Sequence, residues 1–444
     1  MSASDLRGEA EPDVAVRAAP AGTAGAMRHF LHSGVAYWGA MLLAGSSNLV
    51  FNLLAARFLG RDAYGITASL IALINILLIG STAVTRTATA LVAATDERGV
   101  SAWILRRGTW TTVLAGLLLM GLVGALARPL AAFLHLAHPL WIWLVGAAMV
   151  PALAGGITTG ILQGMRSFAA SGAVNLGGAV LKLAALVLLV DAGLGVTGAT
   201  LATLCEVTVI WVGGLAILYR VLRGVAGATP AHVGATRSLF TLPAALTVAR
   251  LVFFNLDILI ARHYLSATQA GLFAALAITG RTIAYGTGAL PPVVYPYLVR
   301  YRQDLALTVK YLLLCLVATA VTGAGAIAVL VVAPTAVVHV LFSAQYASIA
   351  PYVAWYGLAF LLYSLVYVLL HYLLAIESGW VWVYAIGGGL AEIAAMTVFH
   401  SGIGMLTGVE VVFFGLLFIL TSIQTVIALL RGRRGLAAAA IPGA

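Results

Sequence analysis

The chain has 444 residues, of which 62% are hydrophobic and only 9% are charged, and its mean hydropathy is +1.06. This composition excludes an ordinary soluble domain and indicates a protein embedded in lipid. The formal net charge of +10 would favour nucleic acid as the partner of a soluble protein. Here it is better explained by loops that face anionic membrane lipids, so we expect no nucleic-acid partner.

Apolar stretches of membrane-spanning length follow one another from about Ser33 to about Leu430. A helix needs about 20 predominantly apolar residues to cross the hydrocarbon core. We predict twelve spans, at residues 33–56, 64–92, 108–127, 139–163, 169–190, 196–219, 238–262, 269–298, 308–333, 347–375, 379–400 and 405–430. The expected fold class is therefore all-α integral membrane, with about 12 transmembrane helices.

The basic residues are distributed unevenly between the loops on the two sides of these spans. If the N-terminus is cytoplasmic, 16 of the 24 basic residues fall in cytoplasmic segments and four in outer loops, namely Arg57, Arg61, Arg128 and Arg262. The remaining four lie within spans: Arg86, Lys182, Arg250 and Arg281. The excess of Arg and Lys in cytoplasmic loops predicts a multi-pass protein with both termini in the cytoplasm.

The ends of the chain and its middle differ in composition from the spans. The first residues mix Ala, Pro, Gly and both charge signs without periodicity, which predicts a disordered tail and not a signal peptide. Neither Cys205 nor Cys315 suggests a disulfide framework. The expected organisation is a cytoplasmic tail at 1–30, helices 1–6 at 31–222, a cytoplasmic loop at 223–237, helices 7–12 at 238–430 and a cytoplasmic tail at 431–444.

The two halves of the chain repeat each other. Asn52-Leu-Leu-Ala-Ala-Arg57 is similar to Asp257-Ile-Leu-Ile-Ala-Arg262, which lies 205 positions later. Two further pairs, at 177–178 and 387–388 and at 197–198 and 407–408, are 210 positions apart. Six helices make an even number, so the two copies have the same orientation in the membrane. Parallel repeats of this kind are a transporter architecture with the substrate at the repeat interface.

The order of several short motifs resembles that of a known family. These are 51–65, FNLLAARFLGRDAYG; 80–86, GSTAVTR; 195–199, GVTGA; 255–257 through 270–273; 280–281; and 295–296. In this order and spacing they are similar to bacterial polysaccharide flippases of the multidrug/oligosaccharidyl-lipid/polysaccharide exporter superfamily. The resemblance covers residues 33–310 well and the rest more loosely. Two helices that usually extend lipid II flippases are not found.

The resemblance implies an N-lobe and a C-lobe that form a V-shaped central cleft, lined by spans 1, 2, 7 and 8. It implies alternating access and a polyprenyl-diphosphate-linked oligosaccharide as substrate, for surface polysaccharide biosynthesis at the bacterial cytoplasmic membrane. Membrane lipids are expected partners, and polysaccharide polymerase machinery is a further candidate. Drug antiporters of the superfamily typically carry a buried acid in span 1, where this chain offers only Ser46, Ser47, Asn48 and Asn52.

Three buried arginines are the candidate substrate ligands. Arg86, Arg250 and Arg281 lie on spans 2, 7 and 8, and a charge within a span normally faces protein or a water-filled cavity. The planar, permanently charged guanidinium matches the oxygens of a diphosphate. We therefore predict a cationic cleft. The alternative is that each arginine pairs with a nearby acid or carbonyl and only holds helices together, and Arg86 could instead extend to the cytoplasmic surface.

Four other charged residues within spans are candidates for coupling to H⁺ or Na⁺. Asp257 lies seven residues after Arg250, which would place both on one helix face; it is either a coupling site, a release partner for Arg250 or a structural carboxylate. Lys182 and Glu392 occupy equivalent positions in the two repeats. Lys182 with Glu206 is more readily interpreted as an ion pair inside one lobe. No metal site and no cofactor are expected.

Several signatures of enzymes are missing from the chain. Neither lysine follows a glycine, which excludes the phosphate-binding Gly-Lys loop of ATPases. The glycines at 193, 195 and 198 fit a dinucleotide pattern but join two predicted membrane helices, without a strand before them. The predicted function is translocation and not catalysis. The alternatives are an ion-coupled drug or small-solute antiporter, a membrane-embedded glycan polymerase or ligase, and a scaffold that transports nothing.

Overall fold

The computed structural model describes residues 24–95, 97–228, 246–248, 250–288, 290–301 and 304–439. The expected tail before residue 24 and most of the expected inter-lobe loop lie outside these ranges. All of the described secondary structure is helical. The first helix already begins at Ala24 and the last continues to Ala439, so both extend beyond the expected boundaries of the membrane domain.

The first lobe contains helices at all six of its predicted spans. Its elements are α1 (Ala24–Leu77), α2 (Ile79–Thr95), α3 (Arg98–Trp103), η1 (Ile104–Gly108), α4 (Thr109–Ala125), α5 (Ala127–Phe133), α6 (Leu140–Gly164), α7 (Phe168–Leu189), η2 (Val190–Leu194) and α8 (Gly195–Leu222). Within α1 the chain turns sharply at Gly60, where φ is 75°, a backbone conformation that favours glycine. This turn separates predicted spans 1 and 2.

The second lobe contains helices in the described parts of the other six predicted spans. Its elements are helical residues 246–248 and 250–253, then α10 (Leu256–Tyr264), α11 (Ala267–Thr287), α12 (Leu290–Arg300), α13 (Leu305–Val332), α14 (Pro334–Leu341), η4 (Ala344–Tyr352), α15 (Val353–Ala375), α16 (Trp380–Trp382), η5 (Val383–Gly387), α17 (Gly388–Val398) and α18 (Ile403–Ala439). Ser266 and Asp304 cap α11 and α13, because each side chain accepts a hydrogen bond from a backbone N–H of the first turn.

Length and hydropathy confirm a membrane protein. Eight helical stretches in the described residues are long and apolar enough to cross a bilayer, and two of them, Ser46–Thr95 and Phe168–Leu222, each contain two successive predicted spans. The predicted spans 238–262 and 269–298 are not among these stretches; in their described residues the helix is interrupted at Phe254 and Asn255, and α11 ends at Thr287. Inside a bilayer such interruptions are tolerated only where protein or a water-filled cavity surrounds them.

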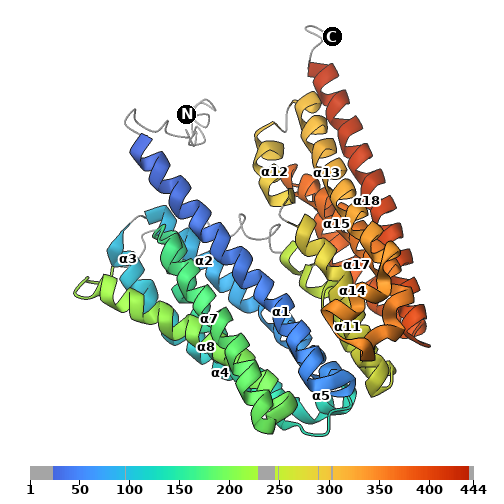
Figure 1. The fold of residues 1–444 in the computed structure, drawn as a ribbon. Coiled ribbons are helices and arrows are strands. Elements are labelled where there is room, and N and C mark those ends of the chain that lie inside the picture. The colour runs from blue at the N-terminus through green and yellow to red at the C-terminus, as the bar shows by residue number, and fades with distance from the viewer. Residues whose placement is uncertain are drawn as a thin grey trace, which may run out of the picture.

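Each lobe is built around one central helix. The spans of α6 and α15 are each 72% buried, whereas those of α4 and α13 are only 22% buried. In the first lobe α6 packs against α2, α4 and α8, and in the second α15 packs against α11, α13 and α18. Figure 1 shows the two lobes, blue to green and yellow to red, meeting at one end and diverging toward the end where α1 begins and α18 finishes.

Candidate functional site

Two arginines form hydrogen bonds between the lobes at the end where the lobes meet. Arg57, at the end of the first span, donates from Nε to the carbonyl of Phe342, 3.1 Å away, and from Nη2 to that of Val340. Arg262, at the end of α10, donates to the carbonyls of Leu134 and His135, at 2.9 and 3.0 Å. Each arginine thus binds the C-terminal end of a short helix, α14 or α5, in the opposite lobe. Carbonyls at that end carry partial negative charge.

These contacts are related by the internal repeat. Arg57 and Arg262 are equivalent positions 205 residues apart. The carbonyls bound by Nε, at 342 and 134, are 208 residues apart, and those bound by Nη2, at 340 and 135, are 205 residues apart. The two lobes therefore exchange the same contact in both directions. We refer to Arg57 and Arg262 together as the arginine latch. Two of the four arginines predicted for the outer loops therefore have a structural role, because they connect the lobes.

Glycines let the lobes approach each other next to the arginine latch. A Cβ added to Gly271 would lie 1.8 Å from the carbonyl oxygen of Arg61, and one added to Gly65 would lie 2.8 Å from the amide of Gly271. Thr268 also donates to Asp62 across this contact, at 2.7 Å. Small residues allow such close backbone packing in membranes. Gly65 and Gly271 are the glycines that follow the two repeated motifs.

We expect loss of the arginine latch to favour a conformation that opens at this end. Arg262 is 4% exposed, and hydrogen bonds to charged groups contribute about 1.5–3 kcal/mol, so Arg262→Ala should raise the open population about tenfold or more. Spin labels at Leu140 and Val340, which are both exposed, should report longer distances by pulsed electron resonance. Arg128→Ala, an exposed arginine on α5, is the control. An unchanged distance distribution in Arg57→Ala/Arg262→Ala would contradict the latch.

A second charged group lies inside the C-lobe. Nη2 of Arg281, on α11, donates to both carboxylate oxygens of Asp257, on α10, at 2.6 Å, and the hydroxyl of Tyr356 donates to Asp257 Oδ2 at 2.6 Å. Arg281 is 3% exposed and Asp257 is fully buried. In this conformation Arg281 faces protein, as the structural alternative requires. Its role as a substrate ligand stays a prediction.

The expectation that Arg250 and Asp257 lie on one face of a continuous helix is wrong. The seven-residue spacing would align them on a continuous helix, but the chain turns at Phe254 and Asn255, and α10 begins only at Leu256. At this turn Oδ1 of Asn255 accepts a hydrogen bond from Nδ2 of Asn75 in the other lobe, at 3.1 Å. Asp257 is thereby directed into the C-lobe, toward Arg281.

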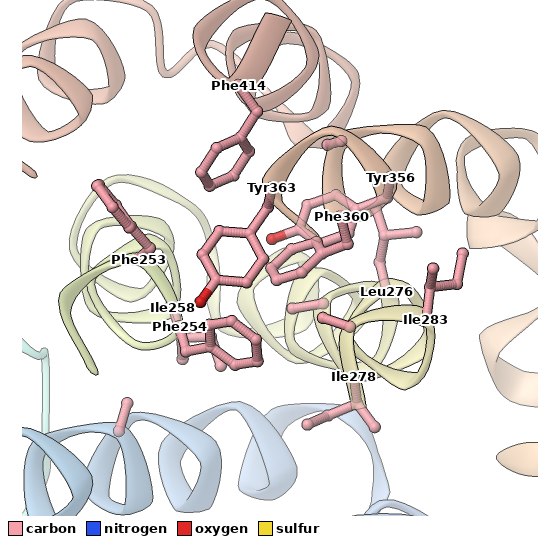
Figure 2. Packing of buried hydrophobic residues seen from close by; sticks show 14 of the residues in the cluster. Phe253, Phe254, Ile258, Leu276, Ile278, Ile283, Tyr356, Phe360, Tyr363 and Phe414 are labelled. Carbon is pink, nitrogen blue, oxygen red and sulfur yellow. The ribbon is translucent and has the colours of Figure 1, made fainter. Parts of the chain in front are cut away.

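Arg250 is exposed and lies at a small pocket lined with aromatic residues. The pocket is formed by Phe254, Tyr363 and Tyr367, with Thr287 and Ser364 among its other lining residues. The Arg250 guanidinium lies 5.7 Å from the centre of the Phe254 ring, and that of Arg281 lies 5.8 Å from the same ring. Figure 2 shows Tyr363 among Phe253, Phe254, Phe360 and Phe414 in the buried aromatic cluster. Both guanidinium groups thus lie near the ring of Phe254.

The three candidate arginines are not brought together. Arg86 lies on α2 in the N-lobe and is exposed, Arg250 is exposed on the C-lobe, and Arg281 is buried within it. Arg250 lies five residues before Asn255, which holds the contact with Asn75 of the other lobe. A substrate that met both exposed arginines would touch both lobes.

The N-lobe contains the ion pair expected from the sequence. Lys182 Nζ, on α7, lies 2.8 Å from Glu206 Oε2, on α8, and donates to Asn48 Oδ1 on α1 at 2.6 Å. The ammonium also lies 4.7 Å from the centre of the Phe51 ring. Lys182 thus connects three helices of one lobe. Whether this group also carries an ion stays a prediction.

Glu392 differs from Lys182, although the two occupy equivalent positions in the repeats. Glu392, on α17, is fully buried, and neither of its carboxylate oxygens has a hydrogen-bond partner. Glu410, on α18, is buried to the same extent, and its two oxygens also lack partners. Glu410 lies early in the predicted span 405–430, and this position gives no sign that its side chain is buried. The sequence therefore predicts no function for it.

Comparison with known proteins gives the family and the fold. Residues 54–351, more than half of the chain, match the family model described as polysaccharide biosynthesis protein. An inward-facing multidrug resistance MATE family transporter of the MOP superfamily is 12% identical, with a TM-score of 0.68 over 88% of this chain and 94% of that one. No curated protein sequence matches significantly.

Two further solved structures place the chain in the same superfamily fold. The lipid II flippase MurJ, in an inward closed conformation, is 14% identical, with a TM-score of 0.62 over 90% of this chain and 92% of that one. An outward-facing MATE transporter is 11% identical, with a TM-score of 0.55 over 90% and 96%. The family model confirms the prediction of a polysaccharide biosynthesis protein, and the solved structures confirm the predicted fold. The chain belongs to the polysaccharide biosynthesis protein family and has the fold of the MOP superfamily of membrane transporters.

Proposed function

We propose that this transporter moves a polyprenyl-diphosphate-linked oligosaccharide across the cytoplasmic membrane by alternating access, for the synthesis of a surface polysaccharide. The family supports a role in polysaccharide biosynthesis. Glycans under construction cross the bilayer with a charged carrier phosphate, which must pass a medium of low dielectric constant. A transporter for such a substrate needs cations that replace the lost hydration of the phosphates.

Arg250 is the observation that supports this substrate class most directly. It lies within the predicted span 238–262, one helical turn before the interruption at Phe254 and Asn255, and so away from both ends of that span. The residue is exposed, and its guanidinium lies among the pocket's aromatic residues, with a side-chain hydrogen bond to Tyr367. An arginine fork binds phosphate oxygens in a bidentate manner. Arg86, on the other lobe, is the second proposed phosphate ligand, and Arg281 could join only if its pairing with Asp257 changes.

The proposed orientation places the diverging end of the lobes in the cytoplasm. The 16 basic residues of the predicted cytoplasmic segments support it. The chain also overlays better on the inward-facing relative than on the outward-facing one, with TM-scores of 0.68 and 0.55. In this orientation the arginine latch closes the outer side, and the substrate enters from the cytoplasmic leaflet. Polysaccharide polymerase machinery would receive it on the other side.

Labelling of introduced cysteines tests the orientation. In a chain with Cys205 and Cys315 replaced by alanine, single cysteines at Arg98, Arg166 and Arg223, all exposed, should react with an impermeant maleimide only after the cytoplasmic side is opened. A cysteine at Arg128 should react in intact cells. Reaction of any of the first three from outside would overturn the proposed topology.

Transport in proteoliposomes tests the function itself. Purified protein should translocate a fluorescent polyprenyl-diphosphate oligosaccharide. Translocation is measured as the increase in the fraction of label that an impermeant quencher can reach. The same lipid with a neutral head group should not compete with it. If instead a lipophilic drug cation is transported and the diphosphate lipid is not, the drug-antiporter alternative is the correct function.

A further inference from the structure

A groove on the outer flank of the N-lobe lies apart from the contacts between the lobes. It has a volume of about 370 Å³ and is formed by α3, η1, the start of α4 and the end of α8. Among its lining residues are Leu105, Arg106, Trp110, Leu215, Tyr219 and Arg223. Figure 1 shows α3 and the end of α8 on the side of the N-lobe that faces away from the C-lobe. A ligand in this groove would therefore not occupy the space between the lobes.

Two arginines from different helices line this groove. Arg106 belongs to the π-helical turn η1, and Arg223 follows the last residue of α8. Both are exposed, and within the part of the chain that the structure describes neither forms an ion pair with an acid. Nη2 of Arg106 donates to the carbonyl of Val225 at 3.5 Å, a long and therefore weak hydrogen bond. The two guanidinium groups thus keep most of their donors for an anion.

Aromatic and apolar side chains continue the groove along the lipid-facing surface. Trp110 and Tyr219 line it and are 77% and 64% exposed. Leu114 and Leu118 follow Trp110 at intervals of four residues, so they lie on the same face of α4, and both are exposed. In membrane proteins Trp and Tyr are enriched where the hydrocarbon meets the headgroups. The surface is therefore cationic at one end and apolar along α4, which matches a lipid with an anionic headgroup.

We propose that this groove binds one anionic phospholipid of the adjoining leaflet, with its phosphate between Arg106 and Arg223 and an acyl chain along α4. Guanidinium groups donate charge-assisted hydrogen bonds to phosphate oxygens, and basic pockets between membrane helices suit anionic headgroups. A zwitterionic lipid would bring its own ammonium group close to the two arginines and should bind less well. Free phosphate would make no use of Trp110 or of the apolar row along α4.

The groove lies where the chain leaves the N-lobe. Gly224, with a φ of 79°, turns the chain after α8, and the amide of Ala228 then donates to the carbonyl of Gly99 at 3.0 Å. A phosphate bound by both Arg106 and Arg223 would add a link between η1 and the end of α8 at this point. A ligand that binds only the folded protein stabilises it. Phosphatidylglycerol should therefore raise the thermal midpoint of the wild-type protein.

Native mass spectrometry of the purified full-length protein measures lipid binding without any transport substrate. The wild-type protein should bind one phosphatidylglycerol at least about tenfold more tightly than phosphatidylcholine with the same acyl chains. Arg106→Ala/Arg223→Ala should lose this preference. The matched control is Arg300→Ala/Arg431→Ala, which removes two exposed arginines of the C-lobe on the same predicted side of the membrane and should keep it. The wild-type comparison is decisive even if a variant fails to fold.

Labelling and competition identify the place and the ligand. A phosphatidylglycerol with a photoreactive acyl chain should label α4 and the end of α8, and neither inorganic phosphate nor a polyprenyl-diphosphate lipid should displace it. Displacement by phosphate would make the groove a general anion site, and displacement by the diphosphate lipid would make it a substrate site; either result overturns the proposal. Equal binding of the two phospholipids, or an equal loss of preference in the control variant, would refute it as well. None of these results depends on translocation, so the lipid site and the proposed function can fail separately.

Discussion

Arg250→Ala should abolish translocation of the diphosphate lipid while the amount of folded protein in the membrane stays near that of the wild type. Arg250 is exposed, so its removal leaves no buried charge without a partner. Loss of a bidentate, charge-assisted contact with phosphate should weaken substrate binding by about 3 kcal/mol, or about a hundredfold. The measurement is the initial rate of translocation per folded transporter in proteoliposomes.

Conservative replacement separates charge from geometry at the same position. Arg250→Lys keeps the positive charge but loses the planar fork, so it should recover only part of the rate. Arg300→Ala, which removes an exposed arginine at the end of α12, is the matched control and should leave translocation unchanged. Full activity of Arg250→Ala would remove Arg250 from the site and with it the main support for a diphosphate substrate.

The number and order of the helices could be predicted because lipid restricts the structures available to the chain. A segment inside the bilayer must satisfy its own backbone hydrogen bonds, so an apolar stretch of sufficient length has few alternatives to a helix. Hydropathy also predicted the turn between spans 1 and 2, but it did not predict how sharp this turn is. The charges of Arg57 and Arg61 mark only the neighbourhood of this turn, whereas its sharpness comes from Gly60, which adopts a φ of 75°.

The internal repeat predicted more than the number of helices. Arg57 and Arg262 were found as equivalent positions of two copies, and they make equivalent contacts with the opposite lobes. The carbonyls that they bind could not be predicted, because backbone groups of α5 and α14 carry no signature in side-chain sequence. Lys182 and Glu206 form the expected pair. A single buried charge is costly within a membrane, and pairing removes this cost for two opposite charges in neighbouring spans.

Pairing within the C-lobe could not be read from spacing alone. A periodicity argument assumes an unbroken helix, and the turn at Phe254 and Asn255 invalidates it for Arg250 and Asp257. Asp257 and Arg281 are 24 residues apart on different helices, a separation that holds no local signal. The burial of Glu410 likewise depends on how α18 rotates against α15 and α17, which is a property of packing and not of any single span.

Removing one member of the Arg281–Asp257 pair should have the largest effect on stability. Both groups are buried, at 3% and 0% exposure, and breaking a buried ion pair by removing one partner costs about 3–5 kcal/mol, because the other charge is left alone in a low-dielectric interior. Arg281→Gln and Asp257→Asn should each lower the thermal midpoint and the membrane abundance. Tyr356 should reduce the cost slightly for Arg281→Gln, because its hydroxyl still donates to the remaining carboxylate.

The double variant Arg281→Gln/Asp257→Asn decides between locking and transport roles for this pair. If the pair only joins α10 to α11, removing both charges should recover much of the stability and most of the translocation, as replacement of both partners of buried pairs often does. The cycle of Lys182→Met and Glu206→Gln provides the comparison in the N-lobe, with a smaller expected cost because Glu206 is 16% exposed. If the double variant is stable but inactive, Arg281 or Asp257 acts in transport. If Arg281 is the residue that acts, it would leave Asp257 during the cycle and bind phosphate, the ligand role that the sequence predicts for it.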